Sequence, residues 1–229
     1  GFLVEAGSTG LMLDAGPGTV AALQAAEAGE RLSALLVTHA HPDHCADVFS
    51  LFNLLRMGPR PRSGLPALAP AGLAAALARF LGVGEDHSFH RVFDWQTVAG
   101  GDRVGVGDLE LAFGFAEHQV TTLITSCSAD GRRLVYSADT GPGGDLVALA
   151  EAADLLVCEA TFQGEPDASG WPYHLSAAGA GALAREAGVR RLLLTHLAPT
   201  LDPEQSVAEA ARAFGGPVAW AAPGLEVEV

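Results

Sequence analysis

Short apolar runs that end in an aspartate or a histidine recur along this 229-residue chain. The runs "LMLD", "ALLVTH", "RRLVYSAD" and "RRLLLTH" end at Asp14, His39, Asp139 and His196, and His118 follows "LELAFGFAE". Such runs are typical of buried strands, and layered α/β folds place ligand sites in the loops at strand ends. One histidine in such a place is more often structural, but five strand ends of this kind predict a shared polar site.

The pattern between these runs predicts alternating strands and helices. "FLVEA" and "LMLDA", joined by "GSTG", predict a β-hairpin, and residues 42–57 predict one continuous helix. Strands dominate residues 89–134, and strand–helix units return after them. We therefore expect an α/β fold in which two sheets pack together under helices, a four-layer αββα sandwich formed by residues 1–229 as a single domain.

The charge of the chain restricts its partners. It has 13 basic and 27 acidic residues, for a formal net charge of −14. This balance makes extended nucleic acid an unfavourable partner, because a phosphate-backbone footprint needs clustered cations. A small anionic substrate held by bound cations is still compatible with it. Every basic residue is an arginine, which excludes a Walker A lysine, a lysine Schiff base and a pyridoxal phosphate anchor.

The cysteines and the hydropathy indicate a cytoplasmic protein without a membrane span. Cys45, Cys127 and Cys158 are far apart, and the chain has no CxxC pair. We therefore expect neither a disulfide framework nor a zinc ribbon, and a reducing compartment. The longest weakly polar segment, residues 65–84, is interrupted by prolines and an arginine, so it does not predict a membrane helix.

The stretch "VTHAHPDHCAD" holds three histidines and two aspartates in residues 37–47. A two-residue spacing puts two imidazoles on one side of an extended or turning segment. Imidazole and carboxylate together favour zinc, with manganese or iron as alternatives. Together with the distant strand ends the stretch gives seven candidate ligands, which suit two metal ions rather than one. The candidates are His39, His41, Asp43, His44, His118, Asp139 and His196.

These motifs resemble a known family. "THAHPDHCAD" is similar to the HxHxDH signature of the metallo-β-lactamase superfamily, and "YSADTGP", "CEATF" and "HLSAAGAGALAREAGVRRLLLTHLAP" resemble its ribonuclease Z and cyclic-nucleotide phosphodiesterase branch, especially small actinobacterial members. The resemblance implies the αββα fold. Similar proteins begin with a strand before the position of Gly1, so we expect one sheet to lack that first strand.

The resemblance also implies how the ligands divide between two divalent ions, with zinc as the expected metal. One ion would take His39, His41 and His118, the other Asp43, His44 and His196, and Asp139 would bridge them. Asp14 would accept a hydrogen bond from a ligand imidazole and orient it.

The mechanism implied by this resemblance is attack of a metal-bridging hydroxide on phosphorus, with Asp43 orienting the hydroxide or taking its proton. His174, in "HLS", would contact the phosphate and protonate the leaving oxygen, while Glu159 would raise its pKa and hold it in place. Two alternatives stay open: His174 as a neighbour of a helix cap at Ser176, and Glu159 as a structural hydrogen-bond acceptor.

The substrate expected from this reading is a small phosphodiester, with a 3′,5′-cyclic nucleotide as the leading choice. Ribonuclease Z enzymes carry a long tRNA-gripping arm between the positions of His118 and Asp139, and here the two residues are only 21 positions apart. The alternatives are a ribonuclease Z-like tRNA 3′ endonuclease, a thioester or lactone hydrolase, and a non-catalytic metal-binding scaffold. Similar proteins are commonly homodimers, so we expect a homodimer here.

Three arginines follow the signature by one helix, in "RMGPRPRSG". Arg56, Arg60 and Arg62 could steer a phosphate toward the site, although a solvated loop is the ordinary reading of such a segment.

Overall fold

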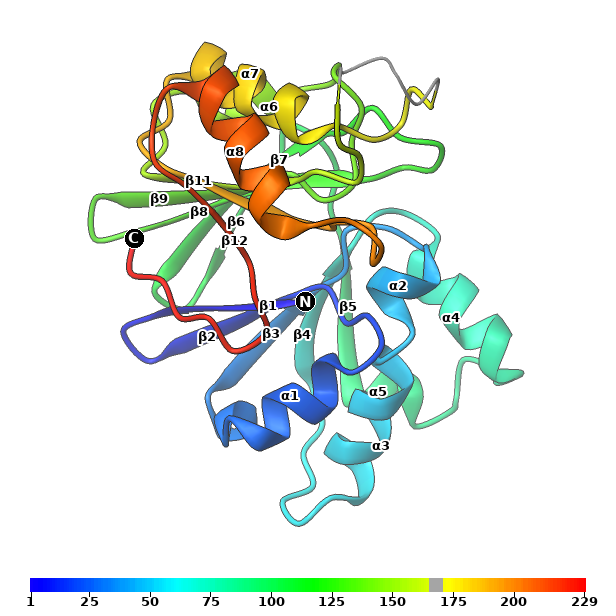
Figure 1. Ribbon diagram of the computed structural model, residues 1–229. Coiled ribbons are helices and arrows are strands. Elements are labelled where there is room, and N and C mark those ends of the chain that lie inside the picture. The colour runs from blue at the N-terminus through cyan, green and yellow to red at the C-terminus, as the bar shows by residue number, and fades with distance from the viewer. Residues whose placement is uncertain (165–170) are drawn as a thin grey trace. The chain divides into compact units, whose positions relative to one another are not determined.

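A computed structural model describes residues 1–164 and 171–229, and its residues group into two compact units (Figure 1). Unit 1 comprises Gly1–Ala99 and Gly105–Leu109, and unit 2 comprises Gly100–Val104 and Glu110–Val229. Each unit has its own sheet, helices and hydrophobic cluster. The expectation that residues 1–229 form a single domain stays a prediction.

Unit 1 contains a five-stranded sheet in the order β1-β2-β3-β4-β5. Its strands are β1 Phe2–Ala6, β2 Thr9–Leu13, β3 Leu32–Leu36, β4 Leu65–Ala69 and β5 Phe93–Thr97. The predicted hairpin is confirmed, because β1 and β2 pair antiparallel. From β2 to β5 all neighbours are parallel, so the carboxyl ends of these strands lie at the same edge of the sheet.

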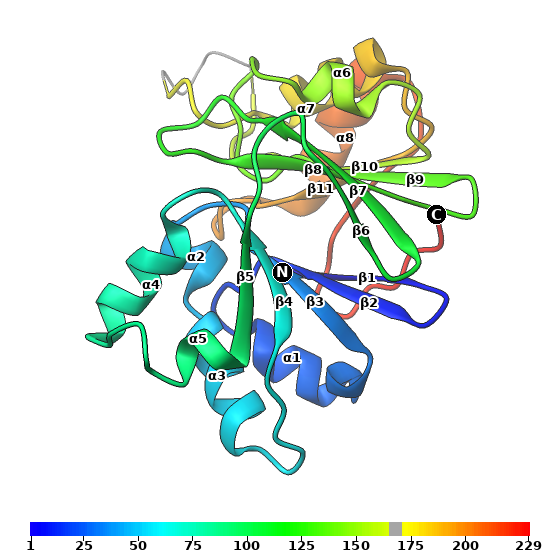
Figure 2. The same cartoon turned by 180° about the vertical axis from the view of Figure 1, so that it is seen from behind.

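The helices of unit 1 cover one face of this sheet (Figures 1 and 2). They are α1 Thr19–Ala25, the 3₁₀ turn η1 Ala28–Glu30, α2 Pro42–Cys45, α3 Val48–Met57, α4 Leu73–Leu81 and α5 Phe89–Val92. Leu35 and Phe93 of the sheet pack with Leu51 and Phe89 of the helices in one buried cluster. The segment from residue 89, predicted to consist of strands, thus begins with a short helix.

The prediction of one continuous helix over residues 42–57 is wrong. The structure has two helices, α2 and α3, separated by Ala46 and Asp47. The backbone N–H of Asp47 donates to the carbonyl of Ala15 at 2.7 Å, and its carboxylate accepts from the N–H of Val20 at 3.0 Å. The bond from the Asp47 N–H to Ala15 takes the place of the helical bond to the Asp43 carbonyl, which interrupts the helix here, and the bond to Val20 holds Asp47 in this position.

The second sheet has seven strands in the order β12-β11-β10-β9-β8-β7-β6. Its strands are β6 Arg103–Val106, β7 Leu109–Phe115, β8 Leu123–Ala129, β9 Arg132–Tyr136, β10 Leu155–Glu159, β11 Leu192–Thr195 and β12 Val218–Trp220. The pairs β7–β8 and β8–β9 are antiparallel, whereas β9, β10, β11 and β12 are parallel to one another. The parallel strands again align their carboxyl ends at one edge.

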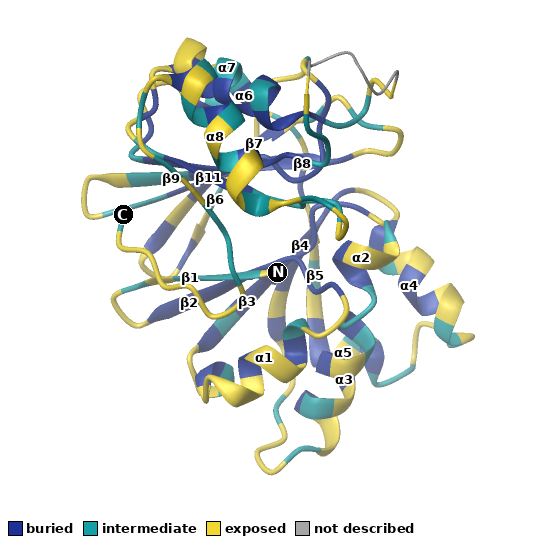
Figure 3. Ribbon diagram, in the orientation of Figure 1, coloured by how far each residue is buried: buried dark blue, intermediate teal, exposed yellow. Residues whose placement is uncertain are grey.

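Helices α6 Leu146–Ala150, α7 Ala177–Ala187 and α8 Pro203–Phe214 belong to unit 2. Small residues let α7 and α8 approach closely: a Cβ on Gly181 would lie 2.4 Å from the carbonyl oxygen of Ala210. Ala180 and Ala210 are fully buried in the cluster that includes Leu156 and Leu194 of the sheet. Figure 3 shows this pattern, with buried residues along the strands and on one side of the helices.

A two-residue turn joins β8 to β9. Ala129 pairs with Arg132, and Asp130 and Gly131 between them both have positive φ, 50° and 74°. Asp-Gly is a preferred sequence for such tight hairpin turns. This hairpin fills most of the 21-residue gap between His118 and Asp139.

The predicted α/β class, with two sheets and accompanying helices, is confirmed. Among the described residues, none of the helices has the length and apolar character needed to cross a membrane.

Candidate metal centre

Asp14 organises the candidate ligands of unit 1. It follows β2 with a φ of 61° and is 1% exposed. Its carboxylate accepts from the Thr38 N–H at 2.7 Å, from the Thr38 hydroxyl at 2.9 Å and from His44 Nδ1 at 2.7 Å. Burial alone would raise the pKa of Asp14, but the hydrogen bond from His44, the positive charge that His44 and His39 carry when protonated, and the Thr38 N–H together hold it below its usual value. The carboxylate is therefore a charged anchor for the histidine loop.

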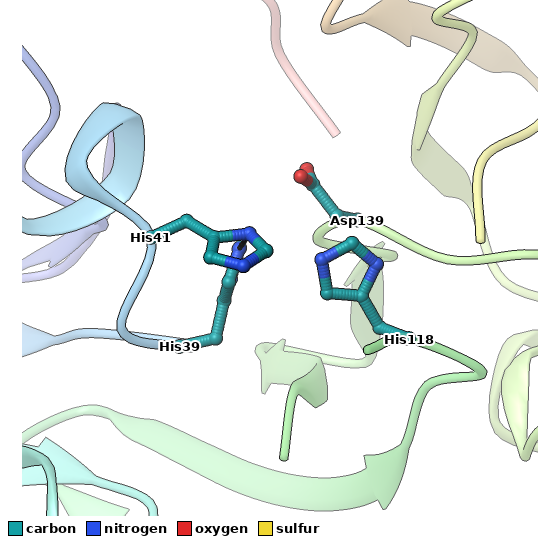
Figure 4. A group of neighbouring side chains, drawn as sticks. All are labelled: His39, His41, His118 and Asp139. Atoms are coloured by element: carbon teal, nitrogen blue, oxygen red, sulfur yellow. Dashed lines mark hydrogen bonds between the residues drawn. The ribbon is translucent and has the colours of Figure 1, made fainter. Parts of the chain in front are cut away.

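His39 and His41 bring two ring nitrogens together. Nε2 of His39 lies 3.2 Å from Nδ1 of His41, and the rings meet edge to face (Figure 4). The other His39 nitrogen, Nδ1, lies 3.0 Å from the Thr38 hydroxyl. Because that hydroxyl donates its one proton to Asp14, it accepts from Nδ1–H of His39, and this tautomer leaves a lone pair on Nε2.

His44 is oriented from behind by Asp14. The bond to Asp14 occupies its Nδ1, and its Nε2 lies 3.7 Å from the Asp43 carboxylate. The His44 ring centroid is 4.1 Å from that of His39. The start of α2 thus places Asp43 and His44 beside the histidine pair.

Gly16 allows this arrangement by close approach of two backbones. A Cβ at this position would lie 1.8 Å from the carbonyl oxygen of Asp43. The neighbouring Ala15 N–H donates to the His44 carbonyl at 2.7 Å. The loop after β2 therefore packs directly against the backbone of α2 only because residue 16 has no side chain.

Asp139 and His196 are the candidate ligands at two strand ends of unit 2. Asp139 follows β9 and is 2% exposed, and His196 follows β11 with a φ of 56°. Nε2 of His196 lies 3.5 Å from a carboxylate oxygen of Asp139.

Thr161 sets the orientation of His196. Its hydroxyl lies 2.8 Å from Nδ1 of His196 and 2.8 Å from a carboxylate oxygen of Glu159. A carboxylate only accepts, so the hydroxyl donates to Glu159 and accepts from Nδ1–H of His196. Nε2 of His196 therefore carries the lone pair that faces Asp139.

Glu159 is fully buried at the end of β10 and accepts hydrogen bonds from several residues. It receives the N–H groups of Thr140, Thr161 and Leu175, the Thr161 hydroxyl, and Nδ1 of His174 at 2.8 Å. These bonds fix His174 so that its ring stacks at 7° on that of His196, with centroids 5.5 Å apart. The carboxylate of Glu159 thus both accepts from backbone N–H groups and holds His174.

His118 lies in the loop after β7. Its Nδ1 is 3.1 Å from the carbonyl oxygen of Tyr173, which makes Nδ1 the donor and leaves Nε2 as the lone-pair nitrogen. Its ring centroid is 5.2 Å from that of His174. Figure 4 shows His118 with Asp139.

The structure thus gathers the predicted residues of each unit at the carboxyl edge of its sheet. In unit 1 these are His39, His41, Asp43 and His44, and in unit 2 they are His118, Asp139, Glu159, His174 and His196. Two contributors were not predicted: Thr38 and Thr161, each between a buried carboxylate and a histidine. Their one signal in the sequence is position, since Thr38 precedes His39 and Thr161 follows Glu159 by two residues.

The donors fit a divalent metal ion. Two nitrogens bound to one tetrahedral zinc at about 2.0–2.1 Å are about 3.4 Å apart, close to the 3.2 Å between His39 and His41 and the 3.5 Å between His196 and Asp139. Several of the histidines also donate a hydrogen bond from the N–H of their other ring nitrogen to a carboxylate, hydroxyl or carbonyl oxygen, as metal-binding imidazoles do. In unit 2, Glu159, His174 and His196 form a further close group of potential ligands.

Comparison with known proteins identifies relatives along most of the chain. Residues 9–197 match the model of a family described as "Beta-lactamase superfamily domain". An uncharacterized protein of Mycobacterium leprae is 36% identical over 225 residues, which cover 95% of this chain and 78% of that protein. A probable metallo-hydrolase of Bacillus subtilis, YhfI, is 27% identical over 203 residues, or 86% of this chain and 79% of YhfI.

One solved structure and one shorter sequence match add to these relatives. The crystal structure of the metallo-beta-lactamase fold protein YhfI from Bacillus subtilis superposes with a TM-score of 0.84 and covers 97% of this chain and 88% of that one. A ribonuclease Z of Myxococcus xanthus is 45% identical over 102 residues, which are 43% of this chain and 33% of that enzyme.

Proposed function

This chain belongs to the beta-lactamase superfamily, and on that premise we propose that it hydrolyses a small phosphodiester, with a 3′,5′-cyclic nucleotide as the substrate. The metallo-β-lactamase fold predicted from the sequence is confirmed, and the protein is a metal-dependent hydrolase. The cofactor is divalent metal, for which the histidines and aspartates supply the donors. The substrate, the number of ions and the role of each residue are the proposal.

The proposed centre holds two zinc ions with the ligand sets that the family resemblance implies. The sets are His39, His41 and His118 for one ion, Asp43, His44 and His196 for the other, and Asp139 for both. The donor set of imidazole and carboxylate supports zinc. Divalent ions bound there supply Lewis acidity and a nucleophile at neutral pH. Asp43, which is exposed beside His44, is available to orient the nucleophile or accept its proton.

The single observation that carries the phosphodiesterase proposal is the pair formed by the buried Glu159 and the partly exposed His174. A phosphodiester releases an alkoxide, which needs a proton, and a histidine held by a carboxylate is a suitable donor. The bond from His174 Nδ1 to Glu159, at 2.8 Å, leaves Nε2 to meet the leaving oxygen.

The size of the substrate is inferred from the β8–β9 hairpin and the charge. The hairpin uses a two-residue turn, so the gap between His118 and Asp139 has no length left for an arm that grips tRNA. A net charge of −14 disfavours a long polyanion, whereas a small phosphodiester brings a single negative charge. Both features support a compact substrate.

A ribonuclease Z-like tRNA 3′ endonuclease is the second candidate, because the 45% identity to such an enzyme extends over 102 residues. The experiment that separates the two candidates offers 3′,5′-cyclic AMP and a pre-tRNA to the zinc-loaded protein side by side. We expect the cyclic nucleotide to be opened and the pre-tRNA to stay intact. Cleavage of the pre-tRNA alone would reverse the ranking.

Two other activities are tested with the same protein. A thioester or a lactone offered as the substrate examines carbonyl hydrolysis, and bis(p-nitrophenyl) phosphate with zinc or manganese examines phosphodiesterase activity. A protein that binds two ions per chain and hydrolyses none of these compounds would be the non-catalytic scaffold.

The remaining proposals concern the surroundings of the protein. We propose a small anionic partner rather than nucleic acid or membrane, and a homodimer, for which the oligomeric state in solution is the test. The three cysteines are free and buried, which supports a reducing cytoplasm as the compartment.

A further inference from the structure

A cavity of about 370 Å³ opens on unit 1, away from the candidate metal centre. Its walls come from the end of α3, the loop before β4, and the residues around α5, and Figures 1 and 2 both show α3 and α5 side by side. The lining consists of Leu55, Arg56, Pro61, Arg62, Ser63, Ser88, Arg91 and Val92. We call it the arginine cavity.

The arginine cavity lies at the opposite edge of the sheet from the histidines. Ser63 precedes the first residue of β4 by two positions, and Val92 directly precedes β5. His39 follows the carboxyl end of β3, which is parallel to both strands. A five-residue strand is about 16 Å long, so a ligand in this cavity does not share the metal centre.

The charge in this cavity is entirely positive. Three guanidinium groups contribute to its lining, and no carboxylate does within the described residues. Arg62 donates to the carbonyl of Gly29 and Arg91 to the carbonyl of Asp86, so each uses few of its five N–H groups on neutral acceptors. In a chain of net charge −14, one cavity lined by three arginines and no acidic residue among the described residues is a notable concentration of positive charge.

Arg60 provides the contrast. It lies in the same loop, but it forms an ion pair with Glu30 and does not line the cavity. Arg56 and Arg62 form no ion pair in the part of the chain that the structure describes. Arg60 thus has an acidic partner, whereas Arg62 in the loop and Arg56 near the end of α3 have none within residues 1–164 and 171–229. Both line the cavity together with Arg91. The guanidinium of Arg56 also lies 5.8 Å from the ring centroid of Phe52.

Ser88 adds a hydroxyl group that the protein leaves unsatisfied. Its side-chain oxygen is buried and has no hydrogen-bond partner among the described residues. A buried hydroxyl without a partner is costly, and rotation of this side chain toward the cavity would let a bound acceptor satisfy it. Partial burial also lowers the pKa of the Arg62 guanidinium, as expected for a cation held partly out of water.

We propose that the arginine cavity binds a small phosphate-bearing molecule, with the phosphate held by Arg56, Arg62, Arg91 and the Ser88 hydroxyl. Guanidinium forks match phosphate oxygens in geometry and charge, and the hydroxyl donates to a further oxygen. The volume is in the range of about 300–1,000 Å³ typical of small-molecule sites. Leu55 and Val92 are buried and provide an apolar wall for the rest of the ligand.

Inorganic phosphate is the probe that tests this site. Its binding to the metal-loaded protein is measured by isothermal titration calorimetry at constant ionic strength. We expect saturable binding that weakens about 10-fold or more in Arg62→Gln and in Arg91→Gln, because each loses a charge-assisted hydrogen bond. Ser88→Ala should weaken binding by a smaller factor. Arg60→Gln is the matched control, with an affinity within about twofold of wild type.

The variants distinguish phosphate binding in the arginine cavity from phosphate binding at the metals and from a loss of binding caused by misfolding. Phosphate bound at the metals would be insensitive to Arg62 and Arg91, so equal affinities in all variants would overturn the proposal, as would a wild-type titration that does not saturate. If Arg62→Gln lowers the thermal unfolding midpoint, Arg62→Lys replaces it, because lysine keeps the positive charge but lacks the two-pronged guanidinium group. Wild-type phosphate affinity in a folded Arg62→Lys variant would also contradict the proposed site. The assay needs no catalysis, so its result is independent of the proposed phosphodiesterase activity.

Discussion

The hydroxyl of Thr161 lies 2.8 Å from Nδ1 of His196, and it donates a hydrogen bond of the same length to the buried Glu159. Unit 1 repeats this relationship with other residues: the hydroxyl of Thr38 lies between Asp14, at 2.9 Å, and Nδ1 of His39, at 3.0 Å. In both places a buried carboxylate fixes the direction of a threonine hydroxyl, and the hydroxyl fixes the tautomer of a candidate ligand.

Thr161→Val should therefore weaken metal binding. Without the hydroxyl, Nδ1–H of His196 loses its acceptor and the ring loses its fixed orientation. We expect zinc affinity at one of the two sites to fall by about 10–100-fold, the usual effect of losing such a partner. A competition titration with a chromophoric chelator measures this. Thr161→Ser keeps the hydroxyl and is the control; equal affinities for the two variants would contradict the role assigned to Thr161.

His174→Ala should keep the metals and lose activity in a way that depends on the leaving group. An alkoxide leaving group needs a proton, so hydrolysis of 3′,5′-cyclic AMP should slow by about 10²–10⁴-fold. The stable p-nitrophenolate needs none, so bis(p-nitrophenyl) phosphate should lose much less. Steady-state rates with both substrates and the zinc content are measured. Loss of zinc, or equal loss with both substrates, would refute the assignment of His174 as the proton donor.

Gly16→Ala should destabilise the protein, because the new Cβ would meet the carbonyl oxygen of Asp43 at 1.8 Å. The backbones of the loop and of α2 must then separate, at a cost of about 1–3 kcal/mol in the free energy of unfolding. Gly29→Ala is the matched control, since a Cβ there has no neighbour within 4 Å in the described structure. Urea denaturation compares the two, and similar losses in both would show that close approach is not the cause.

Asp154 should make stability depend on pH in the acid range. The N–H of Arg133 lowers the pKa of its carboxyl, burial opposes this, and Arg190 and Arg132 lower the pKa further, so that it lies below its usual value. A lowered pKa in the folded state means that the stabilisation is present above the unfolded value of about 3.9 and is lost as the pH falls through the folded value.

Asp154→Asn should remove that part of the pH dependence. The unfolding free energy of the variant should be lower than that of the wild type at neutral pH, by roughly 1 kcal/mol or less because the ion pairs are partly solvated. The two values should converge below about pH 4. Denaturant titrations from pH 3 to pH 7 measure the difference, and a constant difference over this range would show that Asp154 acts through its shape rather than its charge.

The sequence predicted the strand ends of the site well, because periodicity and ligand chemistry coincide there. Asp14, at the end of one apolar run, was expected to orient a ligand imidazole, and it lies 2.7 Å from His44. His39 and His41 were expected on one side of their segment, and their nitrogens lie 3.2 Å apart. The placement of Asp14 at a strand end and of the two histidines on one side follows from local patterns, whereas the orienting role of Asp14 was implied by the family resemblance.

What could not be predicted depends on contacts between distant residues. The break at Asp47 arises from hydrogen bonds to Ala15 and Val20, which the helical pattern of residues 42–57 does not reveal. Threonine is common, so the role of Thr161 became visible only when the structure placed it beside His196. The arginine cavity likewise needs Arg91, which is 29 positions after Arg62.

The tight turn at Asp130 and Gly131 has a consequence for how such a protein can diversify. Both turn residues are exposed, and the strands on either side keep their register through their own pairing. Exposed turns of this kind tolerate inserted segments, since no buried backbone bond is broken. This turn is at the amino end of β9, at the opposite edge of the sheet from Asp139, so lengthening it would add surface there while the strand that leads to Asp139 stays in place. A new contact surface and the metal chemistry can therefore evolve separately.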